Sequence, residues 1–304
     1  TTLQGVLSAE SKVTREEPLA TKTTIRIGGA ARVYVEPANL EDLERVLIEI
    51  SQRAITPVIL GRGSNLLVPD GGVNGVVISL RRTDWETFEV LSDGCVRVGS
   101  GLRLKNLCGL ANKAGLSGFE FLEGIPGNVG GALRMNAGAM GGWMFDVVDE
   151  VELMTYAGER RKYLNSELHY GYRHCTELED TIAIGAVLKP RAVSESEKVG
   201  RQIDVYRSKR QKSQPREPSA GCIFKNPEGD SAGRLIEVCA LKGERVGDAE
   251  VSPVHGNFIV NRGQAKSADV VTLVRRVRSR VKAQTGIELE LEVLLYGAQW
   301  KELL

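Results

Sequence analysis

The chain has 304 residues, of which 42% are hydrophobic and 26% charged, values typical of a globular protein of two or three domains. Its 40 lysines and arginines balance 39 aspartates and glutamates, so no net charge favours binding to nucleic acid or to a membrane surface. No apolar run is long enough to cross a bilayer, and no signal peptide is recognisable. The five cysteines are scattered without a CxxC pair, which indicates neither disulfides nor a zinc site and favours a cytoplasmic location.

The first hundred residues predict a small α/β unit followed by short strands. A helix is predicted over 40–53, because Asn39 is a good N-cap and apolar residues recur at helical spacing. Strands are predicted on both sides of this helix and beyond it, at 31–37, 57–60, 76–80, 88–91 and 96–98.

The rest of the chain mixes helices and strands, which predicts an α+β fold in three sections. Two helices have recognisable starts: Ser194 with Glu197 has the form of a capping box, and Ser267 is expected to cap a long helix that Gly286 ends. Helices are predicted at 102–114, 194–210 and 232–241 and between Ser267 and Gly286, and strands at 147–156, 161–163, 181–188, 222–224, 258–261 and 288–295.

Residues 124–142 contain seven glycines in nineteen positions. Glycine lets a ligand approach the main chain, so this stretch predicts either a phosphate-binding loop or a set of tight turns. A second glycine loop, 61–67, follows a predicted strand. Neither loop has the Gly-Lys-Ser/Thr ending of a Walker A motif or the full Rossmann fingerprint. Two separate loops suit one long diphosphate ligand that is held at both ends.

The motifs resemble, in order, those of the UDP-N-acetylenolpyruvoylglucosamine reductase (MurB) family. The match runs from about Thr23 to Gly297, nearly the whole chain. It lacks the tyrosine-bearing loop that some members insert over the substrate, as in the shorter subclass. The motifs are 61–67 (Gly-Arg-Gly-Ser-Asn-Leu-Leu), 124–131 (Gly-Ile-Pro-Gly-Asn-Val-Gly-Gly), 135–138 (Met-Asn-Ala-Gly), 172–173 (Tyr-Arg), 219–227 (Ser-Ala-Gly-Cys-Ile-Phe-Lys-Asn-Pro) and 291–293 (Leu-Glu-Val).

The resemblance implies a three-domain FAD-binding fold of the vanillyl-alcohol oxidase and p-cresol methylhydroxylase type, with a C-terminal α+β substrate domain. We expect the FAD-binding domain in two parts, 1–68 and 69–214, and the substrate domain at 215–292. The tail, 293–304, could return to the first part. The implied activity is reduction of UDP-N-acetylglucosamine enolpyruvate to UDP-N-acetylmuramate, with FAD as cofactor and NADPH as reductant, in peptidoglycan precursor synthesis.

The family motifs also imply which residues hold the cofactor. We expect FAD to be bound without a covalent link by both glycine loops and by the short motif that follows the second loop. No metal site is expected. The cofactor-binding residues are then Gly61, Arg62, Gly63, Ser64, Asn65, Leu66, Pro126, Gly127, Asn128, Val129, Gly130, Gly131, Asn136, Ala137 and Gly138.

Three residues are the implied catalytic groups. Arg173 would bind the developing enolate by the two-pronged contact that guanidinium makes with carboxylates, although in sequence terms it is also an ordinary loop arginine. Glu292 would help to stabilise the enol, although alone it looks like one of several solvated carboxylates. Cys222 stands where many family members have serine, and we expect its thiol to be the proton donor rather than a nucleophile. Its alternative is a small residue packed on a strand.

The substrate carries a diphosphate, so cations and polar groups of the last section should meet it. Alternatives remain: a basic run at a helix end is often solvated or complements the helix dipole, and a histidine in a turn is often structural. The candidate substrate-binding residues are Arg210, Gln214, Lys225, Asn226 and His255.

Two other functions compete with this interpretation. Another flavin enzyme of the same fold, oxidising alcohols or lactones, would keep both glycine loops but lack the combination of Arg173, Cys222 and Glu292. A nucleotide-sugar-binding or regulatory protein would take up no flavin. The expected partners are the UDP-sugar and NADPH, with no nucleic acid and no membrane. A monomer is expected because no long apolar surface stripe stands out.

Overall fold

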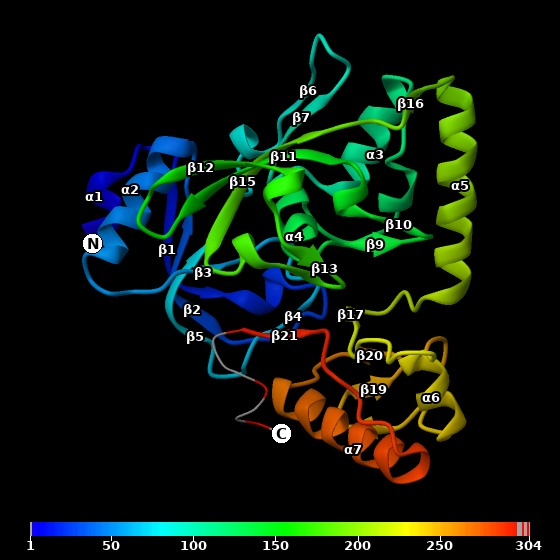
Figure 1. The fold of residues 1–304 in the computed structure, drawn as a ribbon. Helices are drawn as coiled ribbons and strands as arrows, with labels where there is room; N and C mark the ends of the chain where they lie inside the picture. The colour runs from blue at the N-terminus through cyan, green and yellow to red at the C-terminus, as the bar shows by residue number, and fades with distance from the viewer. Residues whose placement is uncertain (1, 297–299, 301–302, 304) are drawn as a thin grey trace. The chain divides into compact units, whose positions relative to one another are not determined.

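A computed structural model describes residues 2–296, 300 and 303. The chain divides into two compact units, each built from separate stretches of sequence. Unit 1 contains residues 1–14, 34–61 and 75–210, and unit 2 contains residues 15–33, 62–74 and 211–304. Helices and strands are mixed along the chain, as the α+β prediction requires (Figure 1). The tail over 293–304 lies partly outside the described residues.

The main sheet of unit 1 has five strands in the order β12-β11-β15-β7-β6, and every neighbouring pair is antiparallel. Its strands coincide with predicted ones to within a residue or so at each end, because most of them are short runs rich in apolar residues. The strands are β6 (Phe88–Val90), β7 (Val96–Gly99), β11 (Val148–Thr155), β12 (Arg160–Leu164) and β15 (Thr181–Leu188).

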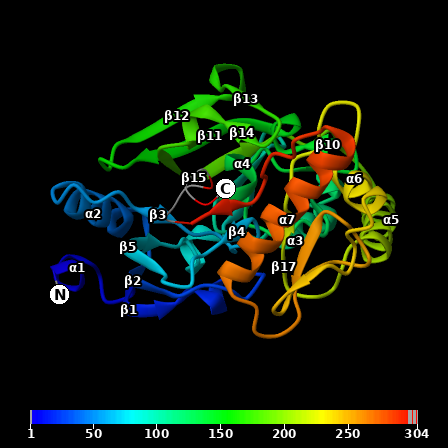
Figure 2. The same cartoon turned by 90° about the horizontal axis from the view of Figure 1, so that it is seen from below.

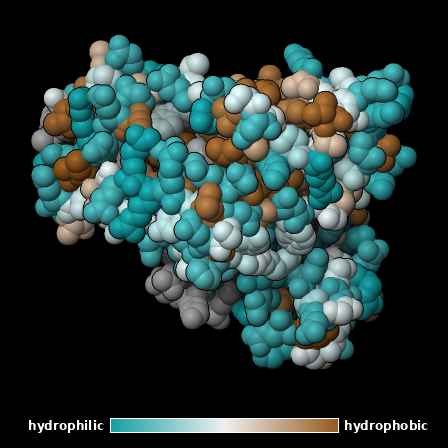
Figure 3. Space-filling model, turned by 45° about the horizontal axis from the view of Figure 1, so that its top comes forward, coloured by the Kyte–Doolittle hydropathy of each residue, from teal (hydrophilic) through white to brown (hydrophobic). Residues whose placement is uncertain are grey.

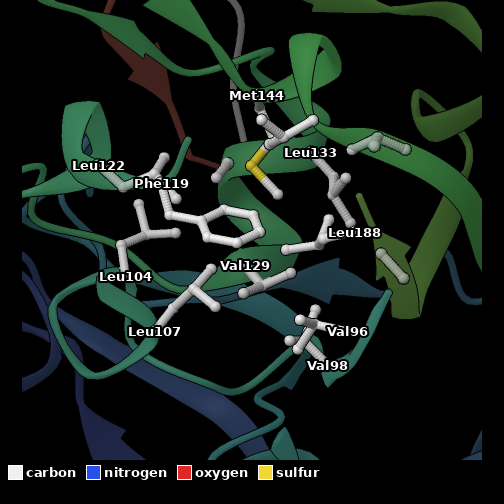
Figure 4. Close-up of a cluster of buried hydrophobic side chains, with 14 of the residues drawn as sticks. Val96, Val98, Leu104, Leu107, Phe119, Leu122, Val129, Leu133, Met144 and Leu188 are labelled. Carbon is white, nitrogen blue, oxygen red and sulfur yellow. The ribbon is translucent and has the colours of Figure 1, made fainter. Parts of the chain in front are cut away.

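Three helices and several short strand pairs surround the main sheet of unit 1. The apolar faces of the helices and of the sheet share one core around Phe119 (Figure 4). Arg207 on the last helix forms an ion pair with the buried Glu123, 3.0 Å away, which ties that helix to the start of the long glycine-rich stretch. The elements are α3 (Leu104–Lys113), α4 (Val129–Arg134), α5 (Ser196–Ser213), β8 (Leu116–Ser117), β9 (Gly138–Ala139), β10 (Gly142–Trp143), β13 (Tyr170–Gly171), β14 (His174–Cys175) and β16 (Ala192–Val193).

A second sheet has the order β1-β2-β5-β3, and three of its strands pass from one unit to the other along the chain. The helix predicted over 40–53 is α2, and Asn39 caps it as expected by accepting the N–H of Asp42. The strand over 12–18 escaped prediction because its charged sequence does not alternate. The elements are α1 (Thr2–Val6), β1 (Lys12–Pro18), β2 (Ala30–Glu36), α2 (Leu40–Ser51), β3 (Val58–Ile59) and β5 (Val73–Ile78).

Unit 2 contains a four-stranded antiparallel sheet, β17-β20-β19-β18, against which two helices pack (Figure 2). Valines of α7 are buried in its core at the predicted positions, and Gly286 ends this helix in the left-handed conformation. The elements are β4 (Leu66–Leu67), β17 (Ser219–Cys222), α6 (Ala232–Val238), β18 (Arg245–Val246), β19 (Ala249–Val251), β20 (Phe258–Asn261), α7 (Ser267–Thr285) and β21 (Leu294–Leu295).

Both predicted serine caps are wrong. Helix α5 begins at Ser196, and the N–H of Ser194 donates instead to the carbonyl of Gly115. Ser267 is the first residue of α7 rather than its cap. The carboxylate of Asp70 accepts the N–H groups of Ser267 and Ala268, so a residue distant in sequence caps this helix.

The strand predicted over 288–295 is also only partly present. Apart from a single bridge at Leu291, the regular part is β21, which pairs in parallel with β4.

On the face drawn in Figure 3, hydrophobic residues lie scattered among hydrophilic ones. No helix within the described residues has the length and apolarity needed to cross a bilayer.

Candidate active site

In unit 2 the first glycine loop is hydrogen-bonded to the segment that carries Glu292. The side-chain amide of Asn65 donates to the carbonyl of Glu292 (3.2 Å), and the N–H of Leu294 donates to the carbonyl of Asn65 (3.0 Å). These two bonds continue into the parallel pairing of β4 with β21. The Glu292 side chain is buried, which breaks the alternation that would have left it in solvent beside Glu288 and Glu290.

The same segment is bonded to the strand that carries Cys222. The N–H of Glu292 donates to the carbonyl of Ile223 (2.8 Å), the residue directly after Cys222. Phe224 forms a bridge with Leu291. The structure therefore brings Cys222 and Glu292 onto adjoining backbone segments of unit 2, and the half-buried Cys222 is not part of a disulfide.

A buried asparagine fixes the cysteine segment from its other side. The side chain of Asn257 accepts the N–H of Phe224 (2.9 Å) and donates to the carbonyl of Phe224 (2.8 Å). Its own carbonyl accepts the N–H of Ile223 (2.9 Å). Asn257 is 2% exposed, so each of these bonds replaces water that the buried groups would otherwise need.

Three of the candidate substrate residues also lie in this region, and each has a structural partner. The ammonium group of Lys225 lies 3.3 Å from the carboxylate of Glu290. The side-chain oxygen of Asn226 accepts the N–H of Ala232 at the start of α6. Nδ1 of His255 accepts the N–H of Asn257, and burial together with nearby Lys242 lowers the pKa of its imidazole, which therefore favours the neutral form.

The other two substrate candidates lie at the end of α5. The guanidinium of Arg210, in unit 1, donates to the carbonyl of Gly124 (3.4 Å), and its side chain packs against that glycine. Gln214 follows α5 in unit 2 and is half-buried. Arg210 therefore supports the start of the glycine-rich stretch, which sequence reasoning did not foresee.

Arg173 belongs to unit 1, where it occupies the two-residue turn between β13 and β14. Its φ is +59°, a left-handed conformation that favours glycine and strains an arginine. The guanidinium carbon lies 5.1 Å from the ring centre of Tyr172 and 5.6 Å from that of Trp143. Sequence reasoning singled out Arg173 but missed Trp143, which carries no motif signal of its own.

Carbonyl groups of the first glycine loop accept hydrogen bonds from residues outside the loop. Arg81 donates to the carbonyl of Gly61, and the N–H of Thr24 donates to the carbonyl of Gly63. Gly63 has a φ of +62°, and a Cβ there would lie 2.7 Å from the carbonyl oxygen of Lys22, so only glycine fits. Thr24 also donates its hydroxyl to the carbonyl of Ser219 (2.7 Å), which links this loop to β17.

The second glycine loop leads into α4 and leaves two buried polar atoms without partners. The N–H groups of Val129 and Gly130 donate to the carbonyls of Leu102 and Ser100, so these two amides serve the protein itself. The side-chain oxygens of Ser100 and Asn128 are buried with no hydrogen-bond partner among the described residues. Buried polar atoms of this kind normally contact water or a ligand.

The motif at 135–138 connects this loop to the arginine hairpin, the β13–β14 pair whose turn carries Arg173. The side chain of Asn136 donates to the carbonyl of Gly171 and accepts the N–H of Phe145. A Cβ at Gly138 would lie 2.2 Å from the ring of Trp143, so the ring packs directly on the backbone there.

Comparison with known proteins first defines the class. A model of an FAD binding domain matches residues 31–163, which include both glycine loops. The chain is thus a flavoprotein with FAD as its cofactor. A second model, the C-terminal domain of UDP-N-acetylenolpyruvoylglucosamine reductase, matches residues 214–296, which include Cys222 and Glu292.

Full-length relatives then define the family. The UDP-N-acetylenolpyruvoylglucosamine reductase 2 of Symbiobacterium thermophilum is 44% identical over 97% of this chain and 96% of its own length. A Geobacter metallireducens reductase is 43% identical over 95% of both chains. The crystal structure of the enzyme from Thermus caldophilus aligns with a TM-score of 0.81 and 40% identity, covering 94% of this chain and 98% of the other. The chain belongs to the UDP-N-acetylenolpyruvoylglucosamine reductase family, which confirms the predicted resemblance, its FAD-binding fold and its oxidoreductase class.

Proposed function

We propose that this protein uses NADPH to reduce the enolpyruvyl ether of UDP-N-acetylglucosamine enolpyruvate to the lactyl ether of UDP-N-acetylmuramate. The observation that carries the proposal is the backbone network of unit 2. It joins a glycine loop of FAD-binding type, through Asn65, to a buried carboxylate and to a half-buried cysteine outside any disulfide, on adjoining segments. An enzyme that transfers hydride and then protonates carbon needs this combination of cofactor loop and acid.

Two features of unit 1 support FAD as the bound group. The buried oxygens of Ser100 and Asn128 lack partners within the described residues and suit a polar ligand. A Cβ added at Gly131 would meet nothing within 4 Å, so the backbone faces open space there. When bound, FAD supplies hydride for the terminal carbon of the enolpyruvyl double bond, after reduction by NADPH.

The protein must then protonate the carbon next to the carboxylate. Cys222 is the proposed donor, because a thiol is a stronger acid than the hydroxyl that many family members carry and can recover its proton from solvent. The two residues that follow it, Ile223 and Phe224, are held by Asn257 and by the Glu292 segment. Such bracing limits the movement of the sulfur relative to its own unit.

Negative charge that develops on the substrate must be stabilised while the proton moves. Arg173 is proposed to bind the substrate carboxylate, because its planar guanidinium can donate two parallel hydrogen bonds. Glu292 is proposed to stabilise the enol form. Both roles are carried over from the family, and the half-buried position of Arg173 in its turn and the buried position of Glu292 are compatible with them.

Substrate binding is proposed for the five polar residues that the family order suggests. Lys225 is the strongest of them, because it follows the Cys222 strand and its Glu290 partner is exposed, so a diphosphate could replace that carboxylate. For Arg210, Asn226 and His255 the present contacts are internal, and each would have to serve both the fold and the ligand. The proposed partners are small molecules, the UDP-sugar and NADPH, in the cytoplasm.

A visible spectrum followed through one catalytic cycle tests the function. The purified protein should show the absorbance of bound flavin, lose it with NADPH, and regain it when UDP-N-acetylglucosamine enolpyruvate is added without oxygen. UDP-N-acetylmuramate should form in equal amount. A colourless protein that takes up no FAD would support the nucleotide-sugar-binding alternative. Reoxidation by oxygen but not by the enolpyruvyl compound would support an oxidase.

A further inference from the structure

The guanidinium of Arg173 contacts two aromatic rings of different origin. Tyr172 is its neighbour in the same turn, whereas Trp143 comes from β10, about thirty residues earlier. The two rings meet edge to face, with centres 5.7 Å apart and planes at 75°. Both centres lie within about 6 Å of the guanidinium carbon, the range in which the negative face of a ring attracts a cation.

Trp143 is itself held firmly in place. Its backbone pairs with Gly138 across β9 and β10, and its backbone N–H donates to the carboxylate of Asp146 (2.9 Å). Its six-membered ring packs so closely on Gly138 that a Cβ there would lie 2.2 Å from the nearest ring carbon. The indole is therefore a fixed surface, whereas Tyr172 is 43% exposed at the turn.

The β13–β14 hairpin that carries Arg173 is attached by two further contacts to residues 136–145, the segment that also carries Trp143. Asn136 donates to the carbonyl of Gly171 (3.0 Å), and the ring of Phe145 stacks on Tyr170 with centres 4.3 Å apart and planes at 10°. These contacts fix the base of the hairpin. They do not fix the long side chain at its tip, which has several rotatable bonds and must be held by contacts of its own.

We propose that Trp143 is a positioning residue that holds the guanidinium of Arg173 ready for the substrate carboxylate. A ring face attracts the cation without forming hydrogen bonds to its N–H groups, so this kind of support does not compete with a bidentate contact to a carboxylate. The inference rests on the proposed function, because it assigns Arg173 to the substrate. It adds that the cofactor motif at 135–138 also supports this arginine, through Gly138 and Trp143.

The test separates the two half-reactions in Trp143→Leu and Trp143→Phe. Reduction by NADPH should proceed at the wild-type rate in both and serves as the control for folding and FAD content. Reoxidation by UDP-N-acetylglucosamine enolpyruvate should slow about threefold to thirtyfold in Trp143→Leu, the range expected for one cation–π contact. Trp143→Phe keeps an aromatic face and should recover most of the rate. Trp143→Met replaces Trp143→Leu if the latter does not fold.

A double variant shows whether Trp143 acts through the arginine. Adding Trp143→Leu to Arg173→Ala should slow reoxidation no further, and binding of the substrate to the oxidised protein, measured by calorimetry, should follow the same pattern. Additive losses, or equal loss in Trp143→Phe and Trp143→Leu, would overturn the inference and leave the proposed function intact. Normal reoxidation in Arg173→Ala alone would instead remove Arg173 from the proposed mechanism.

Discussion

The segment that carries Cys222 and the hairpin that carries Arg173 are supported in different ways. Around Cys222 the support is hydrogen-bonded backbone, with Asn257, Ile223 and Glu292 in buried contacts of 2.8–2.9 Å. Around Arg173 it is mostly aromatic packing in a turn where Tyr172 is exposed and Arg173 is half-buried, with the arginine in a strained backbone conformation. A thiol that must meet one carbon atom benefits from a rigid frame, whereas an arginine that binds a carboxylate can be held more loosely.

The largest effect on stability is expected from breaking the frame around Cys222. Asn257→Ala removes both side-chain bonds to Phe224 and leaves a buried N–H and carbonyl without partners, each worth about 1–3 kcal/mol. We expect unit 2 to lose about 2–5 kcal/mol in urea unfolding. Asn74→Ala, at an exposed contact with Arg32, is the control and should change stability by less than about 0.5 kcal/mol. An equally small loss in Asn257→Ala would show that the frame is not rigid.

Support for the arginine hairpin should be more easily perturbed at Gly138. Gly138→Ala forces the Trp143 ring to move, because the new Cβ would lie 2.2 Å from it, and overpacking of this kind costs about 1–3 kcal/mol. Gly131→Ala is the matched control, since a Cβ there meets nothing within 4 Å. Thermal unfolding of the FAD-free proteins should separate the two variants. Equal melting temperatures would contradict the packing described around Trp143.

The strain at the tip of the hairpin predicts a smaller effect. Arg173→Gly and Arg173→Ala both remove the guanidinium, but only glycine tolerates a φ of +59° without strain. The glycine variant should therefore be about 1 kcal/mol more stable than the alanine variant in chemical unfolding. If alanine is the more stable replacement, the turn does not hold Arg173 in the left-handed conformation.

The smallest expected effect is the pH dependence that His255 adds beside the Cys222 frame. Burial and nearby Lys242 lower the pKa of His255 in the folded state, so the unfolded chain binds the proton more readily. This histidine should therefore destabilise the fold progressively as the pH falls below about 6.5, its ordinary pKa, and have no such effect above it. His255→Asn can still accept the N–H of Asn257. Unfolding curves at several pH values should show a weaker acid destabilisation in that variant, and parallel curves would refute the assignment.

Helices and strands were predicted well where a local sequence pattern determines their bounds. Strands β15 and β20 match their predicted bounds, Asn39 caps α2, and Gly286 ends α7. The failures have tertiary causes. The α7 helix is capped by Asp70, nearly two hundred residues away in sequence, and no local pattern could indicate that. The strand β1 is charged and non-alternating, and it exists only because it is part of a sheet.

The candidate site was visible mainly through its motifs, and the contacts that position it were not. Cys222 and Glu292 could be named from resemblance, but only the structure places them on hydrogen-bonded segments. Strand alternation would have put Glu292 in solvent, whereas a switch from alternating to consecutive burial at Glu292 and Val293 encloses it. Asn257 and Trp143 were missed because each is an isolated residue whose role depends on a partner distant in sequence.

The central claim, that the framed thiol of Cys222 delivers the proton, is tested most directly by single-turnover kinetics of Cys222→Ala and Cys222→Ser. Both variants should be reduced by NADPH as fast as the wild type. Reoxidation by UDP-N-acetylglucosamine enolpyruvate should be at least about 100-fold slower in Cys222→Ala, the contribution expected of a general acid, while Cys222→Ser keeps most of the rate. Wild-type reoxidation in Cys222→Ala would contradict the account.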